Sequence, residues 1–422
     1  MWERAIDKIE RMSSRVSDLV AFWEEATEVI GGVVPYYSTP CWYTLDPASL
    51  LITSHYHQGM PEFPAQWLAE EYYGDDVNQL SDVARSPDGL STLHEATGGD
   101  PSASPRWARN RELGGDQELI ARLRVRSGEV WGMLGLYREP GRPLFDADEK
   151  KFIKALSPPL AEGARRALLA GQAADPEGPD APAVLIVTDR WEIESATPGV
   201  ARWLRALPDG DFDAGRLPSA VLSVAGRALR TAETPARPGE VTLARVLSRS
   251  GAWVVLHGAC LTSPNRPRVA VIIEPAQPAG IAELLMAAWD LSPREQELTR
   301  LILQGAPTEQ IAERLVISVH TVRHHLKSIF DKAGVRSRRD LMAKVFFTHY
   351  EPRLRDNEHR ALNGGPVRGG PFPAREHQLM TAEDDPSTAT SPPRRTARRT
   401  NGDHPAPTTA ARKLKTPTRT IT

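Results

Sequence analysis

The feature that most constrains how this chain folds is a series of helix-start and helix-stop signals within residues 290–348. Ser292 can accept a hydrogen bond from the free amides of a first helical turn, and Pro293 suits the first helical position. Glu295 stands three residues after Ser292 and completes a capping box. Gly305 favours a stop, because glycine readily adopts the left-handed conformation that ends many helices. The stretch therefore predicts a helix that begins after Ser292 and ends before Gly305.

Three further helices are predicted in the same block. A short one covers residues 308–315 and is followed by a turn of three residues. Ser318 then caps a third helix over residues 319–333, and a fourth covers residues 337–346. Two helices joined by a turn of three or four residues form the core of a helix-turn-helix, whose second helix enters the major groove of DNA. The block is therefore expected to form an all-α four-helix domain.

The third predicted helix separates apolar and polar side chains onto two faces. Arg323 and Lys327 stand four residues apart, so both point outward to a common partner. Outward arginine and lysine side chains on a helix of this size reach guanine edges or phosphate oxygens. The opposite face is expected to be core, because its apolar residues recur at helical spacing. These residues are Val322, Leu326, Ile329, Phe330 and Ala333.

The same helix admits three other interpretations. His320 and His324 stand one turn apart and could ligate zinc, but no acidic residue or cysteine adjoins them and no third ligand is apparent. Acid–base catalysis needs an orienting carboxylate and a pocket, which an exposed helix face does not supply. A solvated polar face on an ordinary helical domain is the third interpretation. The ordered capping signals favour DNA contact, so no metal, cofactor or enzymatic activity is expected.

The segment from Leu291 to Leu341 resembles the LuxR/FixJ-type output domain along its full length. The landmarks are SPRE, IAERL, the pair IS before TVRHHL, and GVRSR. The resemblance implies a four-helix domain that binds double-stranded DNA as a homodimer. By position it places some side chains at the bases, others at or near phosphates, and two arginines on a positive surface beyond the helix. The expected DNA contacts are Thr321, Arg323, His324, His325, Lys327, Arg336 and Arg338.

One departure from the family pattern concerns the start of the second helix. Pro307 and Thr308 stand where the family often has a capping box led by serine. Thr308 can still cap, but Ile311 cannot return the second hydrogen bond. The start of this helix is therefore expected to be looser than usual.

The first 170 residues are expected to form an α+β domain. A long amphipathic helix over residues 2–29 comes first, and hairpin signals follow over residues 41–57 and 118–139. A closing helix begins after Phe145 and Asp146. Together these elements predict an antiparallel sheet with helices packed on it.

This layout resembles a GAF sensory domain over about residues 15–170. The stretches GEVWGMLGLYRE and GRPLFDADEKKFIKAL match the family's central strand, the loop after it and its last helix. The resemblance implies a sensory role with varied small molecules as effectors, or none. Trp42 and Trp131 are predicted to line a pocket, although aromatic residues on strands are more often core.

Residues 183–275 predict a second α+β domain, with residues 184–188 as its first strand and a helix beginning near Pro198. The order of strands and helix resembles a PAS-like domain. Thr197 stands where many members of that family have asparagine, so a polar contact typical of the family is in doubt.

Composition shifts divide the chain further. Residues 171–182 are predicted to be a linker, residues 276–289 a linker helix, and residues 350–422 a disordered tail rich in Pro, Arg and Thr. Net charge is only −2, so any DNA-binding surface must be local. No apolar run is long enough for a membrane span, and the two cysteines suit a reducing cytosol.

These observations predict a cytoplasmic transcriptional regulator whose sensory domains control a helix-turn-helix. Its partners would be double-stranded DNA, a second copy, an unknown small-molecule or protein effector, and RNA polymerase. The alternative function is a protein-interaction scaffold whose helical C-terminal block binds a protein partner. The effector, the operator, the direction of regulation, a sensory role for the second domain and the role of the tail do not follow from the sequence.

Overall fold

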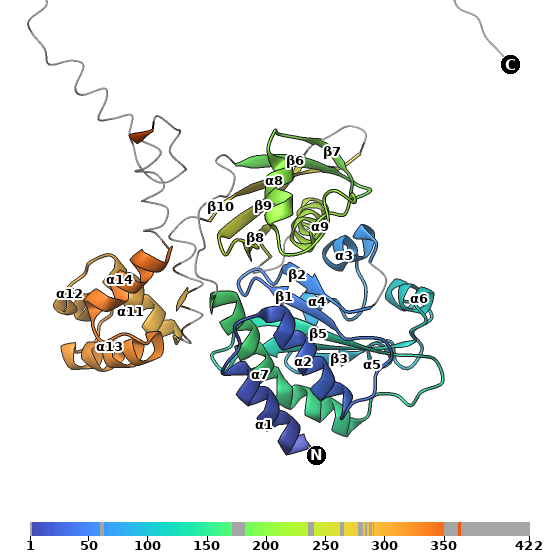
Figure 1. Ribbon diagram of the computed structural model, residues 1–422, viewed down its shortest axis with the longest axis horizontal. Helices are drawn as coiled ribbons and strands as arrows, with labels where there is room; N and C mark the ends of the chain where they lie inside the picture. Colours follow the sequence, from blue (N-terminus) through green and yellow to red (C-terminus); the bar gives the residue numbers. More distant parts are fainter. Residues whose placement is uncertain are drawn as a thin grey trace, which may run out of the picture. The chain divides into compact units, whose positions relative to one another are not determined.

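The computed structural model describes three folded regions of the 422-residue chain (Figure 1). For residues 170 and 345–349 only the backbone is described. The predicted linker 171–182, the predicted linker helix 276–289 and the predicted tail 350–422 lie almost wholly outside the described residues. The described residues are 2–59, 63–170, 182–234, 240–261, 266–276, 282, 285–286, 289, 291–349 and 362–363.

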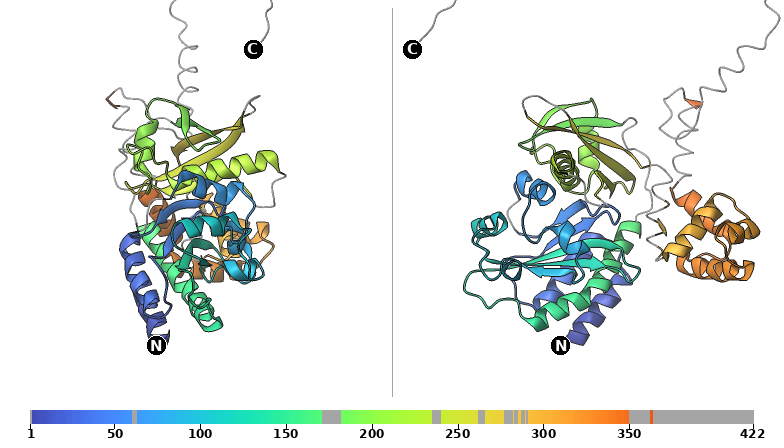
Figure 2. Two further views of the ribbon diagram at one scale, coloured as in Figure 1. Left: turned by 90° about the vertical axis from the view of Figure 1, so that its right-hand side faces the viewer. Right: turned by 180° about the vertical axis from the view of Figure 1, so that it is seen from behind.

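The first region is an antiparallel five-stranded sheet with the strand order β2-β1-β5-β4-β3. Helices α1, α2 and α7 lie side by side on one face of the sheet, as Figures 1 and 2 show. Both predicted hairpins and the closing helix are confirmed. The elements are α1 (Trp2–Ser13), α2 (Leu19–Gly31), β1 (Cys41–Leu45), β2 (Ile52–Tyr56), α3 (Ala65–Tyr73), α4 (Leu80–Arg85), β3 (Leu90–Thr92), α5 (Leu93–Ala96), α6 (Pro105–Glu112), β4 (Gln117–Arg124), β5 (Val130–Arg138) and α7 (Ala147–Ala170).

The predicted single helix over residues 2–29 is wrong, because the chain forms two helices there. The Ser13 hydroxyl donates to the carbonyl oxygen of Glu10 at 2.9 Å, a local bond of the kind that competes with a continuing helix. Asp18 then caps a new helix by accepting a hydrogen bond from the amide of Ala21 at 2.8 Å. Amphipathic spacing runs through the break, so periodicity alone did not reveal it.

The second region repeats the same strand order in a second antiparallel sheet, β7-β6-β10-β9-β8. Its first strand coincides with the predicted one, and α8 begins two residues after Pro198. The long helix α9 was not predicted as such. The elements are β6 (Ala183–Thr188), β7 (Ile193–Ala196), α8 (Val200–Ala206), α9 (Ser219–Glu233), β8 (Leu243–Leu247), β9 (Trp253–Leu261) and β10 (Arg268–Pro275).

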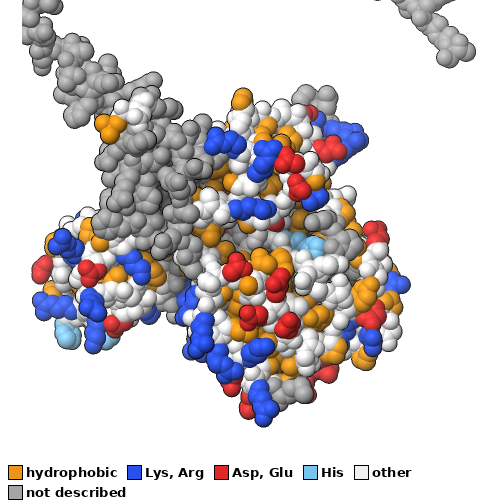
Figure 3. Space-filling view, viewed as in Figure 1, with side chains coloured by type: hydrophobic (Ala, Val, Ile, Leu, Met, Phe, Trp, Pro, Cys, Tyr) orange, Lys and Arg blue, Asp and Glu red, His pale blue; other side chains and the backbone are white. Residues whose placement is uncertain are grey.

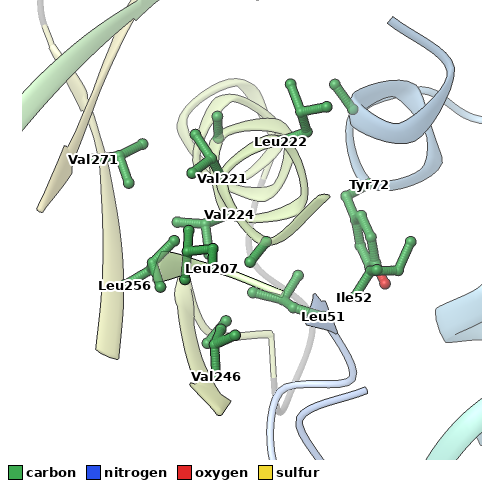
Figure 4. Packing of buried hydrophobic residues seen from close by; sticks show 14 of the residues in the cluster. Leu51, Ile52, Tyr72, Leu207, Val221, Leu222, Val224, Val246, Leu256 and Val271 are labelled. Atoms are coloured by element: carbon green, nitrogen blue, oxygen red, sulfur yellow. The ribbon is translucent and has the colours of Figure 1, made fainter. Parts of the chain in front are cut away.

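The first two regions share a hydrophobic core, which the sequence did not predict. Every residue of α9 from Ser219 to Leu229 is buried, because the helix is packed between its own sheet and the first region (Figure 4). Side chains from β2 and α3 meet α9 on one side, and side chains from β8, β9 and β10 meet it on the other. The members of this shared core that are labelled in Figure 4 are Leu51, Ile52, Tyr72, Leu207, Val221, Leu222, Val224, Val246, Leu256 and Val271.

A glycine sets how closely α9 approaches α3. A Cβ atom on Gly226 would lie 2.3 Å from the carbonyl oxygen of Ala69, which is backbone and cannot move aside cheaply. The hydroxyl of Ser223, one turn earlier, donates to the carbonyl oxygen of Ile52 at 2.9 Å. The second region thus covers β2, the edge strand of the first sheet, whose free backbone groups would otherwise invite pairing with another chain.

A buried ion pair also joins the two regions. The carboxylate of Asp46 accepts from Arg245 Nη2 at 2.8 Å and Nε at 3.0 Å, and from the Arg245 backbone amide at 2.8 Å. The side chains are 0% and 8% exposed. Because both charges are removed from water, loss of either side chain would leave the other charge buried without its partner, which is strongly destabilising.

The third region contains α11 (Pro293–Leu303), α12 (Thr308–Arg314), α13 (Val319–Ala333) and α14 (Arg338–His349). The predicted capping box at Ser292 is confirmed, with Glu295 returning the second hydrogen bond. Helix α12 follows Pro307 and has no side-chain cap, so the cap expected from Thr308 is absent. The four helices enclose a small core that includes Leu298, Ile302, Ile311, Val322, Ile329 and Leu341.

Candidate nucleic-acid interface

Helix α13 is fixed at both ends by local signals. The amide of Thr321 donates to Ser318 Oγ at 3.0 Å, and Gly334 ends the helix with φ +64°. The buried face holds Val322 and Ile329 against the core. The amide of Ile317 donates to the carbonyl oxygen of Ala312 at 3.0 Å, so the turn between α12 and α13 is also ordered.

The opposite face of α13 presents the predicted DNA contacts to solvent. Arg323, His324 and Lys327 are exposed, whereas Thr321 and His325 are half-buried beside them. Within the part of the chain that the structure describes, no carboxylate forms an ion pair with Arg323 or Lys327. Figure 3 shows Lys, Arg and His side chains gathered over the α13 edge of this region. The face can therefore contact an anionic surface without breaking an existing ion pair.

The last turns of α13 are tied to α11 by a residue that the sequence identified only as a cap. Glu295 is 4% exposed and accepts from the Ser328 hydroxyl at 2.6 Å and from Lys332 Nζ at 2.8 Å. Burial alone would raise the pKa of Glu295, but these donors and Ser292 lower it to about 2. The sequence offered one signal for this contact: Glu295 is a capping residue, and Ser328 and Lys332 stand four residues apart on a later helix.

The two predicted arginines beyond α13 differ in their surroundings. Arg336 is exposed. Arg338 is half-buried, and its Nη1 donates to the carbonyl oxygen of Ala306 at 2.9 Å, which ties the start of α14 to the chain after α11. Part of the Arg338 side chain therefore serves the fold, and its contact with DNA stays a prediction.

The sequence did not predict that Arg294 contacts the end of α12, just before the turn that leads into α13. Arg294 Nη1 pairs with Glu297 at 2.7 Å, and its Nη2 donates to the carbonyl oxygen of Leu315 at the end of α12. An arginine in a first helical turn carries no sign of a partner 21 residues later. Arg294 thus helps to hold the short helix that precedes α13.

The zinc interpretation gains no support from the geometry. Among the described residues, no group of three or more His, Cys, Asp or Glu side chains is arranged to hold a metal ion. His324 and His325 contact each other edge to face, with ring centroids 6.3 Å apart.

The first region holds a cavity of about 280 Å³ between the sheet and helices α3, α4 and α6. Trp42 and Trp131, the predicted pocket residues, do not line it. Both are 1% exposed and lie in the core under α1, α2 and α7, where Trp42 stacks on Trp23 with ring centroids 4.4 Å apart. Strand alternation could not tell which face of the sheet carried the cavity.

No helix among the described residues has the length and apolar character to cross a membrane.

Comparison with known proteins places the similarity in the third region. Residues 290–345 match the family described as bacterial regulatory proteins, luxR family. The spore germination protein GerE of Bacillus subtilis is 36% identical over 55 residues, which are 13% of this chain and 74% of GerE.

Two further relatives are longer proteins. The nitrate/nitrite response regulator protein NarL of Escherichia coli K12 is 44% identical over 48 residues, 11% of this chain and 22% of NarL. The probable transcriptional regulatory protein SgaR of Hyphomicrobium methylovorum is 40% identical over 70 residues, 17% of this chain and 30% of SgaR. The chain thus spans less than a third of the length of either protein.

Solved structures resemble larger parts of the chain only distantly. A phycocyanobilin-bound GAF domain from a cyanobacterial phytochrome covers 40% of this chain and 96% of that domain, with 16% identity and a TM-score of 0.31. Escherichia coli SdiA covers 81% of this chain and 96% of its own, with 12% identity and a TM-score of 0.29.

Proposed function

Because this chain belongs to the LuxR family of bacterial regulatory proteins through residues 290–345, we propose that it is a sequence-specific DNA-binding transcriptional regulator. The observation that carries the proposal is the exposed face of α13, where Arg323, His324 and Lys327 stand without an acidic partner among the described residues. Arginine and lysine in the major groove read guanine edges, and neighbouring hydroxyl and imidazole groups reach phosphates.

The decisive experiment compares genome-wide binding of the wild-type protein with that of an Arg323→Ala, Lys327→Ala double variant. The matched control is Arg4→Ala, Lys8→Ala, which removes the same two residue types at the same spacing from the exposed side of α1. Site-specific peaks should appear for the wild type and the control and be lost in the α13 variant. A wild-type protein without preferred sites, or equal losses in both variants, would refute the proposal.

Salt dependence separates DNA binding from the alternative of a protein-interaction scaffold. Contacts to several phosphates release counterions, so affinity for a promoter fragment should fall by orders of magnitude between about 50 and 200 mM salt. An apolar interface with a protein partner would not weaken in this way.

The proposed regulator is cytoplasmic, acts through binding rather than catalysis, and influences RNA polymerase.

We further propose that it binds as a homodimer on half-sites about one helical turn apart. Footprinting of the sites found above would show paired protections at that spacing. A single protected half-site at saturating protein would contradict the dimer.

Sensory control by a GAF-like and a PAS-like region is the finer part of the proposal. A cavity in the first region and its shared core with the second support it, because a ligand there would affect both regions together. Deleting residues 1–275 should change dimerisation, DNA affinity or promoter response. If all three stay unchanged, the sensory role is abandoned.

A further inference from the structure

The cavity in the first region has an unbalanced set of charges in and behind its wall. Four carboxylates share two guanidinium groups, so the cluster carries more negative than positive charge when all are ionised. The groups are Glu70, Glu71, Asp76 and Glu118 on one side and Arg106 and Arg109 on the other.

Both guanidinium groups are already occupied. Arg106 Nη1 lies 2.7 Å from Glu71 Oε2, and Arg106 Nε lies 2.7 Å from Glu118 Oε2, with all three side chains less than 10% exposed. Arg109 Nη1 lies 2.9 Å from Glu70 Oε2. An anionic ligand would therefore have to compete with carboxylates that already hold these donors.

The negative charge is not fully satisfied by the protein. Glu118 Oε2 accepts from Arg106 and from Asn78 Nδ2, at 2.7 and 3.4 Å, but no donor among the described residues reaches Glu118 Oε1. Glu118 is 2% exposed and lines the cavity. Burial also raises the pKa of Glu71 to about 7, although Arg106 opposes the rise. A cation in the cavity would supply the missing donor and charge.

Aromatic rings form much of the remaining wall. Phe63 and Trp67 lie with ring centroids 5.7 Å apart at the start of α3. Ring faces attract cations, most strongly where water is excluded. The volume of about 280 Å³ is at the small end of ligand sites. The aromatic lining consists of Tyr37, Tyr43, Phe63, Trp67 and Tyr137.

We propose that this cavity binds a small organic ammonium ion, with its positive head at Glu118 and its body against the aromatic rings. The inference deepens the proposed function by naming the chemical class of the effector, and it rests on that function only for the consequence of binding. Binding itself is a property of the first region and is tested without DNA.

The experiment measures binding of three probes to the full-length protein by calorimetry. The probes are 2-phenylethylammonium, 2-phenylethanol and phenylacetate, which share an aromatic body and differ in the charge of the head. The cation should bind about tenfold or more tightly than the alcohol, in keeping with a desolvated cation–π contact and an added ion pair, and the anion should bind weakest. Equal affinities, tightest binding of the anion through Arg106 or Arg109, or no binding of any probe at millimolar concentration would overturn the proposal.

Variants separate recognition from folding. Glu118→Gln should reduce affinity for the cation about tenfold and leave affinity for the alcohol unchanged. Because Glu118 also holds Arg106, Trp67→Leu gives a second test that removes the ring and leaves a smaller apolar side chain. Its matched control is Trp107→Leu, a half-buried tryptophan on α6 that does not line the cavity. A loss for cation and alcohol alike in Glu118→Gln, or equal losses in the two tryptophan variants, would count against the proposal.

The proposed ligand of the cavity and the proposed control of DNA binding can be refuted separately. If the cation binds but leaves promoter affinity unchanged, sensory control is refuted and the cavity assignment stands. If promoter binding is confirmed but no cation binds, the assignment of the cavity fails alone.

Discussion

At the scale of single residues, Val316 departs most clearly from ordinary backbone geometry within the helix-turn-helix. It has φ +53° in the turn before α13 and is 89% exposed. A β-branched residue in the left-handed region is strained, because its side chain crowds the backbone. The sequence showed a three-residue turn here but not which of the three residues takes the strained conformation.

Val316→Gly is expected to stabilise the turn by about 0.5–1 kcal/mol, since glycine adopts positive φ without strain. Amide hydrogen exchange in α12 and α13 measures this, and exchange should slow. Val316→Ala is the control, because it shortens the side chain but keeps a Cβ atom. If alanine stabilises as much as glycine, exposure of the valine side chain and not backbone strain is responsible.

At the scale of elements, helix starts were predictable and contacts between helices were not. The capping box at Ser292 lies within four residues, so its signal is readable in the chain. Glu295 meets Lys332 across 37 residues, and nothing local distinguishes it from a simple cap. The break between α1 and α2 was missed for a related reason, because periodicity continues through it.

Glu295→Gln tests the tie between α11 and α13. The pKa of Glu295 is lowered from 4.5 to about 2 in the folded protein, so its stabilisation is present above pH 4.5 and is lost as pH falls through 2. The variant should lose about 1–3 kcal/mol at pH 7, and its difference from wild type should vanish toward pH 2.

Hydrogen exchange in α13 at several pH values follows this difference. Glu297→Gln is the matched control on the same helix, because its pair with Arg294 is exposed and contributes at most about 1 kcal/mol. A pH-independent effect at Glu295 would show that packing, not charge, makes the contact.

Gly226→Ala tests the approach of α9 to α3. In an ordinary helix interior this change stabilises by up to about 1 kcal/mol. Here the added Cβ would meet the carbonyl oxygen of Ala69, so a loss of about 1–3 kcal/mol is expected. Thermal unfolding of the full chain gives the sign. Gly32→Ala is the neutral control, since its nearest neighbour would lie at an ordinary 3.6 Å.

At the scale of the whole molecule, composition shifts divided the chain into segments but did not reveal that two of the folded regions share a core. Asp46 and Arg245 are 199 residues apart, and neither stands in a pattern that predicts burial. Likewise, Trp42 on β1 and Trp131 on β5 were predicted to line a pocket, but both lie in the core and do not line the cavity. Such facts depend on packing between distant segments, which period and capping do not encode.

Asp46→Asn should uncouple the first two regions. It leaves Arg245 buried without its full countercharge, which typically costs about 3–5 kcal/mol. Calorimetry should then show two transitions where the wild type shows one for these regions. Glu194→Gln, which removes the exposed partner of Arg268, is the control and should change stability by at most about 1 kcal/mol. A single unshifted transition in Asp46→Asn would mean that the apolar core alone couples the regions.

The burial of α9 on two sides has a practical consequence for anyone recombining modules of this chain. The Pro/Gly-rich stretch at 171–182 suggests a boundary at which the chain could be cut and fused to another protein. A fusion made there would expose one apolar side of α9 and leave β2 uncovered. Fusions that carry residues 1–276 together should therefore stay in solution, whereas fusions that carry only the first or only the second region should aggregate.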